Sequence, residues 1–312
     1  MNTLAVVLQR PQQLALTRLD LTPATDEDVV VDIEWSGIST GTERLLWSGR
    51  MPEFPGMGYP LVPGYESVGR VTHAGARSGA QIGDRVFVPG AKCFGDVRGL
   101  FGGAASRVVL PGARTVRISE QLGEQGVLLA LAATAYHVAA GVAERQPDLV
   151  IGHGVLGRLI ARLAVAAGTS PLVWETNAVR RDGAQGYRVV DPSTDSRRDY
   201  RRICDVSGDA ALLDTLISRL AHGGEVVLAG FYDTPLSFLF APAFMREAQI
   251  RVAAQWQSAD LVAVRDMAQS GALSLDGLIT HRQDATSADA AYRTAFSDPA
   301  CLKMTLDWRD CP

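Results

Sequence analysis

Residues 149–168, which read LVIGHGVLGRLIARLAVAAG, constrain the fold of this chain more than any other stretch. The apolar run 149–151 predicts a short buried strand, and apolar residues at helical spacing over 156–167 predict a helix directly after it. Three glycines, Gly152, Gly154 and Gly157, occupy the turn and the start of that helix. Because Glu175 ends the next apolar run, about twenty residues on, this order predicts a dinucleotide-binding βαβ unit.

Each glycine of such a turn has its own role. The first makes the tight turn, the second lets the backbone approach a pyrophosphate, and the third permits close packing of helix on strand. The helix N-terminus then faces the anion. We therefore predict that the whole turn binds the cofactor, with His153 either touching the pyrophosphate or facing solvent; its residues are Gly152, His153, Gly154, Val155, Leu156 and Gly157.

The acid after the second strand bears on the choice between NAD and NADP. The Glu175 carboxylate would pair with ribose hydroxyls and repel the 2′-phosphate of NADP, so NAD is favoured. Arg180 and Arg181 follow closely, and they either soften this preference or remain solvated.

Composition excludes several classes of protein. With 312 residues the chain has room for two domains and a large core. Its 30 basic and 34 acidic residues argue against an electrostatic nucleic-acid binder. The four scattered cysteines fit a reduced cytoplasmic protein better than a disulfide scaffold. The N-terminus has no signal-peptide pattern, and the apolar run 127–143 is short for a transmembrane segment and predicts a buried helix.

The pattern of predicted secondary structure changes near residue 120. Before that point, short apolar or alternating segments predict antiparallel strands at 5–8, 14–16, 29–35, 68–72, 85–89 and 105–109, with a loop rich in glycine, proline and aromatic residues after the third. After it, helices and strands alternate, which predicts a parallel sheet with right-handed crossovers.

Four motifs in this order resemble the medium-chain dehydrogenase/reductase superfamily: GDRV at 83–86, TAYH at 134–137, the glycine turn, and HGGEVVLAGF at 222–231. The resemblance implies an α/β protein with a GroES-like β-rich catalytic domain, residues 1–131 and 259–312, and a Rossmann domain with a doubly wound parallel sheet, residues 132–258. Many relatives pair through the edge strand of that sheet, here near 250–256, so a homodimer is expected.

The loop 37–71, GISTGTERLLWSGRMPEFPGMGYPLVPGYESVGRV, more narrowly resembles the bacteriochlorophyllide dehydrogenase family. Members oxidise a 3-(1-hydroxyethyl) substituent to 3-acetyl with NAD, which implies a chlorin or bacteriochlorin pigment as substrate. Flat, apolar and adaptable side chains in this loop suit a macrocycle, although they could equally pack the loop onto its domain. They are Trp47, Met51, Phe54, Met57 and Tyr59.

The resemblance also predicts that catalysis proceeds without zinc. Zinc enzymes of the superfamily hold the metal with a cysteine after G-I, a histidine in G-H-E and a cysteine four residues before the threonine of T-A-Y-H. The corresponding residues here are Ser39, Tyr65 and Ala130, whose side chains cannot form that site. Glu66 could bind a metal alone, or it could hold an arginine or a backbone amide.

Alcohol oxidation without a metal still needs a group that accepts the hydroxyl proton. Tyr65 is the first candidate, with Ser39 or Thr42 as a relay and Glu43, Glu66 or His137 as a base; their structural alternatives are a tyrosine packed in the site, turn-stabilising hydroxyls and a buried core histidine. The resemblance places Thr134 near the nicotinamide and places Ser207, Gly208, Gly230 and Phe231 along the cofactor, although loop geometry alone would explain the glycines.

Three functions therefore compete at this point. The first is NAD-dependent, zinc-independent oxidation of a hydroxyethyl chlorin. The second is a zinc-free quinone or enoyl reductase of the same superfamily, against which Glu175 counts because such enzymes usually take NADPH. The third is a catalytically inactive protein that binds NAD or a pigment.

Overall fold

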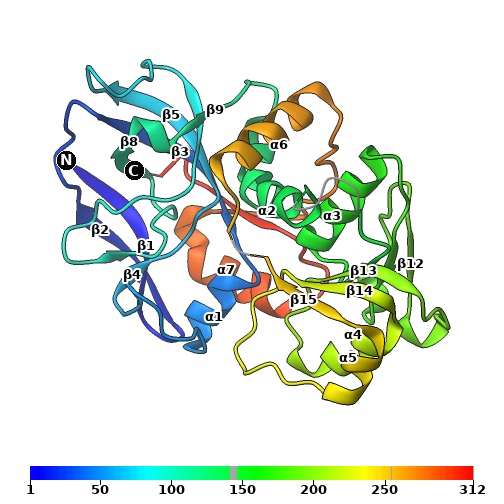
Figure 1. Ribbon diagram of the computed structural model, residues 1–312. Coiled ribbons are helices and arrows are strands. Elements are labelled where there is room, and N and C mark those ends of the chain that lie inside the picture. Colours follow the sequence, from blue (N-terminus) through cyan, green and yellow to red (C-terminus); the bar gives the residue numbers. More distant parts are fainter. Residues whose placement is uncertain (141–145, 254, 312) are drawn as a thin grey trace. The chain divides into compact units, whose positions relative to one another are not determined.

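The chain is divided into two compact units in the computed structural model, which describes residues 1–140, 146–253 and 255–311 (Figure 1). The first unit combines Met1–Ala130 with Leu278–Pro312, and the second, Leu131–Gly277, is inserted between these two segments. The sequence placed the return to the first unit at residue 259, whereas the contacts place it at Leu278. The difference arises because helix α6 (Ser258–Ser270) packs within the second unit, where its Asp260 contacts His137.

The first unit is built on two sheets, as the β-rich pattern predicted. Its strands are β1 (Asn2–Arg10), β2 (Gln13–Asp20), β3 (Asp28–Ile38), β4 (Leu61–Val62), β5 (Ser67–Ala74), β6 (Arg85–Val88), β7 (Arg98–Gly99), β8 (Arg107–Pro111), β9 (Val116–Arg117), β16 (His281–Asp284) and β17 (Met304–Asp307). One sheet has the order β2-β1-β4-β7, and the other has the order β16-β17-β3-β5-β6-β9 with β8 paired to β3. Strand β17 runs antiparallel to β3 with Met304 opposite Ile38, so the start of β17 lies beside the end of β3.

A helix interrupts the region that the sequence predicted to be a loop. Helix α1 (Thr42–Ser48) begins after Gly41 and ends at Gly49, whose φ of 74° is the left-handed conformation that favours glycine. Its apolar side buries Leu45 and Leu46. Helix α7 (Ala288–Ser297), from the C-terminal segment, lies beside α1 (Figure 1) and contacts it through Tyr292.

The second unit contains the parallel sheet that the alternating pattern predicted. Its strands are β10 (Leu149–Ile151), β11 (Leu172–Trp174), β12 (Arg188–Val190), β13 (Tyr200–Asp205), β14 (Leu220–Leu228) and β15 (Gln249–Val252). They lie in the order β12-β11-β10-β13-β14-β15, so the strand order reverses between β10 and β13. Such a switch point, at the carboxyl ends of the strands, is where doubly wound sheets bind ligands. Of the edge strand expected at 250–256, residue 254 lies outside the described residues.

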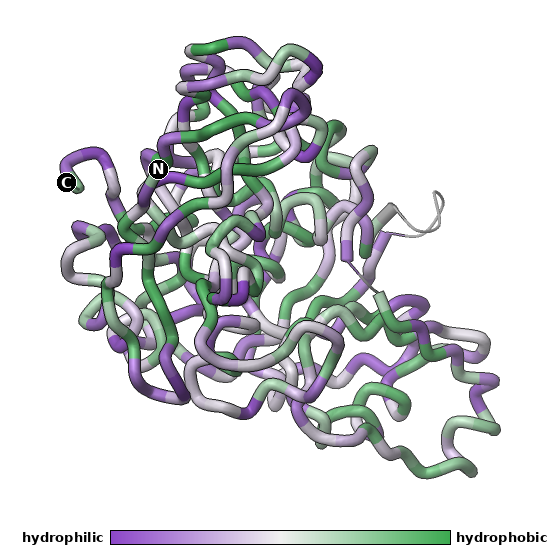
Figure 2. Tube along the Cα trace, turned by 90° about the vertical axis from the view of Figure 1, so that its left-hand side faces the viewer, coloured by the Kyte–Doolittle hydropathy of each residue, from purple (hydrophilic) through white to green (hydrophobic). Residues whose placement is uncertain are grey.

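The second unit contains helices, but they do not follow every strand of its sheet. They are α2 (Leu129–Ala140), α3 (Val155–Ala166), α4 (Leu213–Arg219), α5 (Phe240–Arg246) and α6. The connections from β11 to β12 and from β12 to β13 each contain a single 3₁₀ turn, Ala178–Arg180 and Pro192–Thr194. Figure 2 shows hydrophobic stretches alternating with hydrophilic ones along the trace, as expected for buried strands joined by surface connections. Within the described ranges we find no helix that is long and apolar enough to cross a membrane.

Candidate active site

The glycine turn after β10 has the geometry that a dinucleotide requires. Gly152 has φ of 98°, and a Cβ on Gly157 would lie 1.9 Å from the Gly152 carbonyl oxygen, so α3 packs directly against the turn. A Cβ on Gly154 would meet nothing within 4 Å, which leaves open space at the position where backbone approaches a pyrophosphate. No side chain caps the N-terminus of α3, so the first-turn amides of Val155 and Leu156 fit an anion.

Glu175 is held tightly against this turn. One carboxylate oxygen accepts from the backbone N–H of His153 at 3.0 Å, and the other accepts from that of Asn177 at 2.8 Å. The residue is only 9% exposed, and each oxygen keeps a lone pair for a further donor. Arg181 points to other acceptors: it donates to the Glu175 carbonyl oxygen and forms an ion pair with Asp191 at 2.5 Å.

His153 does not face solvent, so one of the two sequence expectations for this residue is wrong. It is fully buried, its Nδ1 lies 2.6 Å from the Arg180 carbonyl oxygen, and its Nε2 lies 2.8 Å from the Tyr187 hydroxyl. Because a carbonyl only accepts, Nδ1 carries the proton and Nε2 accepts from Tyr187. Burial lowers the pKa of His153 to about 4, so the ring is neutral near pH 7. Both nitrogens are therefore engaged within the protein.

Arg158, on α3, holds the short connection that follows β11. Its guanidinium donates to four backbone carbonyls, those of His153, Arg180, Asp182 and Gly183, at 2.7 to 3.2 Å. Three of these carbonyls lie in the connection after β11, which contains only one 3₁₀ turn and so offers them few backbone donors. Neither Arg158 nor Tyr187 was predicted from the sequence, since a helix-face arginine ordinarily indicates solvent exposure.

The predicted residues after β13 and β14 lie together. A Cβ on Gly208 would come 2.9 Å from the Phe231 carbonyl oxygen, and a Cβ on Gly230 would come 2.9 Å from the Gly208 nitrogen. Ser207 lies beside Gly152 and is turned toward Asp205, whose Oδ1 accepts from both its backbone N–H and its hydroxyl. These residues and the glycine turn all follow the carboxyl ends of neighbouring strands in the sheet.

Two further candidates lie on α2 in the second unit. Thr134 is half-buried in the helix. His137 is half-buried and places Nδ1 2.9 Å from the Asp260 carboxylate, which joins α2 to α6; its role as a base stays a prediction.

A cluster of hydroxyl groups lies in the first unit where β3 meets α1. The Ser39 and Tyr65 hydroxyls are 2.7 Å apart, and Thr42 is also hydrogen-bonded to Tyr65. Ser39 is buried, while Tyr65 and Thr42 are half-buried. Burial and the adjacent Glu66 carboxylate raise the pKa of Tyr65 above its ordinary value, so its phenol stays protonated at neutral pH. The structure thus brings together three of the residues predicted for proton transfer.

Glu43 and Glu66 lie behind this cluster and are both fully buried. Glu43 accepts from the Tyr292 hydroxyl at 2.6 Å, and burial raises the pKa of its carboxyl to about 7. Glu66 accepts from Lys303 Nζ at 2.6 Å; burial raises the pKa of its carboxyl, and the ammonium opposes that shift. Sequence reasoning missed Tyr292 and Lys303, which come from the C-terminal segment and belong to no local motif.

Ser39, Tyr65 and Ala130 are the residues that the family resemblance places at the zinc-ligand positions. Ser39 and Tyr65 hydrogen-bond each other, and Ala130 is a fully buried methyl group. Over the part of the chain that the structure describes, no three histidine, cysteine, aspartate or glutamate side chains gather closely enough to hold a metal ion. The four cysteines are not joined in disulfides.

The five residues predicted for pigment binding pack into one apolar cluster of the first unit. Met51 is buried in that cluster with Leu46 and Leu61, and Trp47, Phe54, Met57 and Tyr59 pack against it. The Tyr59 hydroxyl also donates to the Leu46 carbonyl oxygen. This is the packing role that the sequence left open beside pigment binding.

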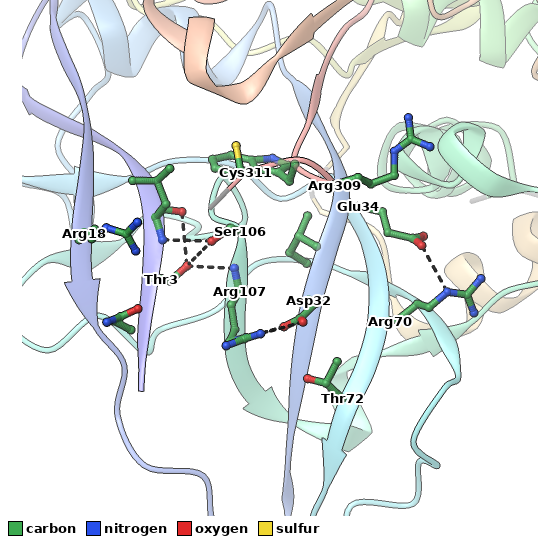
Figure 3. A pocket seen from close by; sticks show the side chains of 14 residues that line it. Thr3, Arg18, Asp32, Glu34, Arg70, Thr72, Ser106, Arg107, Arg309 and Cys311 are labelled. Carbon is green, nitrogen blue, oxygen red and sulfur yellow. Dashed lines mark hydrogen bonds and ion pairs between the residues drawn. The ribbon is translucent and has the colours of Figure 1, made fainter.

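A separate pocket of about 400 Å³ lies in the first unit (Figure 3). Two of its arginines pair with acids that also line it: Arg107 binds Asp32, and Arg70 lies 3.3 Å from Glu34. None of the site residues predicted from the sequence lines this pocket.

The chain is similar to known alcohol dehydrogenases in sequence and in fold. Residues 25–120 match the alcohol dehydrogenase GroES-like domain. Two proteins named 2-desacetyl-2-hydroxyethyl bacteriochlorophyllide A dehydrogenase are similar over 99% of this chain and 99% of their own length, at 58% identity in Cereibacter sphaeroides and 57% in Rhodobacter capsulatus. In fold, the chain resembles a short chain alcohol dehydrogenase from E. coli CFT073 complexed with cofactor NADH, with a TM-score of 0.83, 20% identity and coverage of 98% and 99% of the two chains.

Proposed function

Because the chain belongs to the family of 2-desacetyl-2-hydroxyethyl bacteriochlorophyllide A dehydrogenases, we propose that it oxidises the 3-(1-hydroxyethyl) group of a bacteriochlorophyllide to 3-acetyl, with NAD and without zinc. The choice of substrate rests on the similarity to these relatives, which are 58% and 57% identical over nearly their full length. The hydrogen bond between Ser39 and Tyr65 supports the zinc-independent chemistry, because two metal-ligand positions are used to build a chain of hydroxyls.

Oxidation of the alcohol releases a hydride from the carbinol carbon and a proton from its oxygen. When bound, the nicotinamide ring accepts the hydride. The alcohol hydroxyl donates to the Tyr65 oxygen as Tyr65 passes its own proton to Ser39 or Thr42 and on to solvent. The raised pKa of Tyr65 suits a relay, since the phenol starts and ends the step protonated. The residues that would hold the cofactor are those of the glycine turn and Glu175.

NAD is the proposed form of the cofactor. The Glu175 carboxylate has free lone pairs that suit ribose hydroxyl donors, and its negative charge repels a 2′-phosphate. Arg181 is paired with Asp191 and so does not offset that charge.

One assay separates this proposal from its alternatives. Purified protein is incubated with NAD and a 3-(1-hydroxyethyl) bacteriochlorin, and NADH formation and the absorption shift of a 3-acetyl product are followed together. We expect both signals, with activity unchanged by a zinc chelator. Cofactor binding without turnover would favour an inactive NAD- or pigment-binding protein, and reduction of quinones or enones with NADPH would favour the reductase.

Homodimer formation through β15 is also proposed. This strand lies at the edge of the sheet, and its Val252 is 73% exposed. Phe240 and Phe244, on the neighbouring α5, are 73% and 65% exposed. A second copy would cover both the apolar side chains and the unpaired strand edge. The cytoplasmic location expected from the scattered cysteines stays a prediction.

A further inference from the structure

The peptide unit between Ile38 and Ser39 is held by a charged group on each side. Its carbonyl oxygen accepts from Lys303 Nζ at 3.2 Å, and its N–H donates to Glu43 Oε1 at 3.0 Å. The Ser39 carbonyl oxygen in turn accepts from the Glu43 N–H at 3.1 Å. Both of the charged side chains are at most 1% exposed. The backbone that carries the Ser39 hydroxyl is therefore fixed from both sides.

Glu43 and Lys303 each have a second partner, and each of the two resulting pairs contains one residue from the C-terminal segment. Tyr292 donates its hydroxyl to Glu43 Oε2 at 2.6 Å, and Lys303 donates to Glu66 Oε2 at 2.6 Å. Glu66 follows Tyr65 directly in the chain, and its backbone carbonyl accepts from the Gly37 N–H at 2.7 Å. The two buried pairs thus constrain both ends of the hydrogen bond between Ser39 and Tyr65.

Stabilisation of the fold is a poor explanation for this buried charged network. Burying an ion pair removes two charges from water, and well-packed apolar side chains often stabilise a fold as well or better. Glu66 Oε1 is in addition buried without a hydrogen-bond partner. A charged network retained under such conditions fits a role in fixing geometry.

We propose that Tyr292 and Lys303 are positioning residues, which hold the Ser39 and Tyr65 hydroxyls at the separation that proton transfer from the alcohol requires. The inference rests on the proposed function, in which these two hydroxyls carry the proton. Tyr292 acts through Glu43, and Lys303 acts through the Ile38 carbonyl and Glu66.

A double-mutant cycle tests the role of Tyr292. We expect Tyr292→Phe to lower kcat at least fivefold with the KM for NAD unchanged, and to cause no further loss in a Tyr65→Phe background. The matched control is Tyr200→Phe, which removes another buried tyrosine hydroxyl donating to a carboxylate, at 2.7 Å from Asp195, in the other unit. Losses that multiply in the double variant, an unchanged kcat in Tyr292→Phe, or an equal loss in the control would overturn the inference.

Lys303 provides a second test if Tyr292→Phe does not fold. We expect Lys303→Met to lower kcat and Lys303→Arg to recover most of it, since arginine keeps the charge and the donors. Equal kcat in these two variants would contradict a positioning role. Failure of the proposed function is recognised separately, because Tyr65→Phe alone would then turn over at the wild-type rate.

Discussion

The backbone N–H of His153 donates to the Glu175 carboxylate at 3.0 Å, so the acid expected to face the ribose also closes the glycine turn. In the proposed function, Glu175 would therefore affect both the choice of cofactor and the shape of the glycine turn. We expect a substitution at this position to change both, and the two effects are separable by measurement.

Glu175→Gln tests cofactor choice. Loss of the charge removes the repulsion toward a 2′-phosphate, so we expect the ratio of kcat/KM for NADP to that for NAD to rise about tenfold, or by about 1.4 kcal/mol of discrimination. Steady-state kinetics with both cofactors provides the measurement. Asp182→Asn is the control, because it removes an exposed charge from the same connection; an equal rise there would disprove a specific role for Glu175.

His153 gives the protein a measurable dependence of stability on pH. Burial lowers the pKa of the ring from 6.5 to about 4, so between these values the unfolded chain binds more protons than the folded one. Stability is therefore lost as the pH falls through this window, by up to about 3 kcal/mol from this group. Urea unfolding at several pH values should show a shallower loss in His153→Gln. An identical pH dependence in the variant and the wild type would contradict this account.

Glu43 should make turnover depend on pH near neutrality. The ionised carboxylate accepts from both Ser39 and Tyr292, whereas a protonated one must give up an acceptor. Because burial raises its pKa to about 7, and Lys303 and Glu66 oppose each other in that shift, we expect kcat to fall as the pH drops through about 7.

Tyr292→Phe sharpens this prediction, because it removes a hydrogen bond that lowers the Glu43 pKa. The inflection in kcat should then move to higher pH, and Glu43→Gln should abolish it. An inflection that stays at the same pH in both variants would assign it to another group.

Val252→Arg tests the proposed dimer. A charge on this exposed edge residue should prevent strand pairing, and sedimentation velocity should show a monomer where the wild type is a dimer. Ile82→Arg is the control, since Ile82 is similarly exposed, at 71%, in the first unit. A dimer that persists in Val252→Arg would rule out β15 as the interface.

The nucleotide end of the protein could be predicted from sequence because its requirements are local. A strand, three glycines and an acid at the end of the next strand lie within 30 residues, and each has a distinct backbone role. The alternating pattern likewise predicted the parallel sheet, and the strands of the second unit do pair in parallel. Helix α1 was not predicted because it is only seven residues long and is flanked by glycines, which on their own indicate a loop.

Only some residues of the proposed proton-transfer region could be predicted from the sequence. Ser39, Thr42 and Tyr65 lie in one loop with recognisable neighbours, whereas Lys303 reaches Glu66 across 237 positions of sequence. A single lysine near the chain end carries no pattern that distinguishes it from a surface residue. Arg158 was missed for a related reason, because its partners are backbone carbonyls, which leave no signature in side-chain chemistry.

The insertion of the second unit into the first has a consequence for biosynthesis. A ribosome releases Ser39 and Tyr65 early, but Tyr292 and Lys303 emerge only after the whole nucleotide unit has been made. The cofactor-binding sheet can therefore form on a nascent chain in which β17 has not yet joined β3. In the proposed mechanism the residues that position the proton relay are therefore made last, so we expect a chain that terminates before Tyr292 to lack that network.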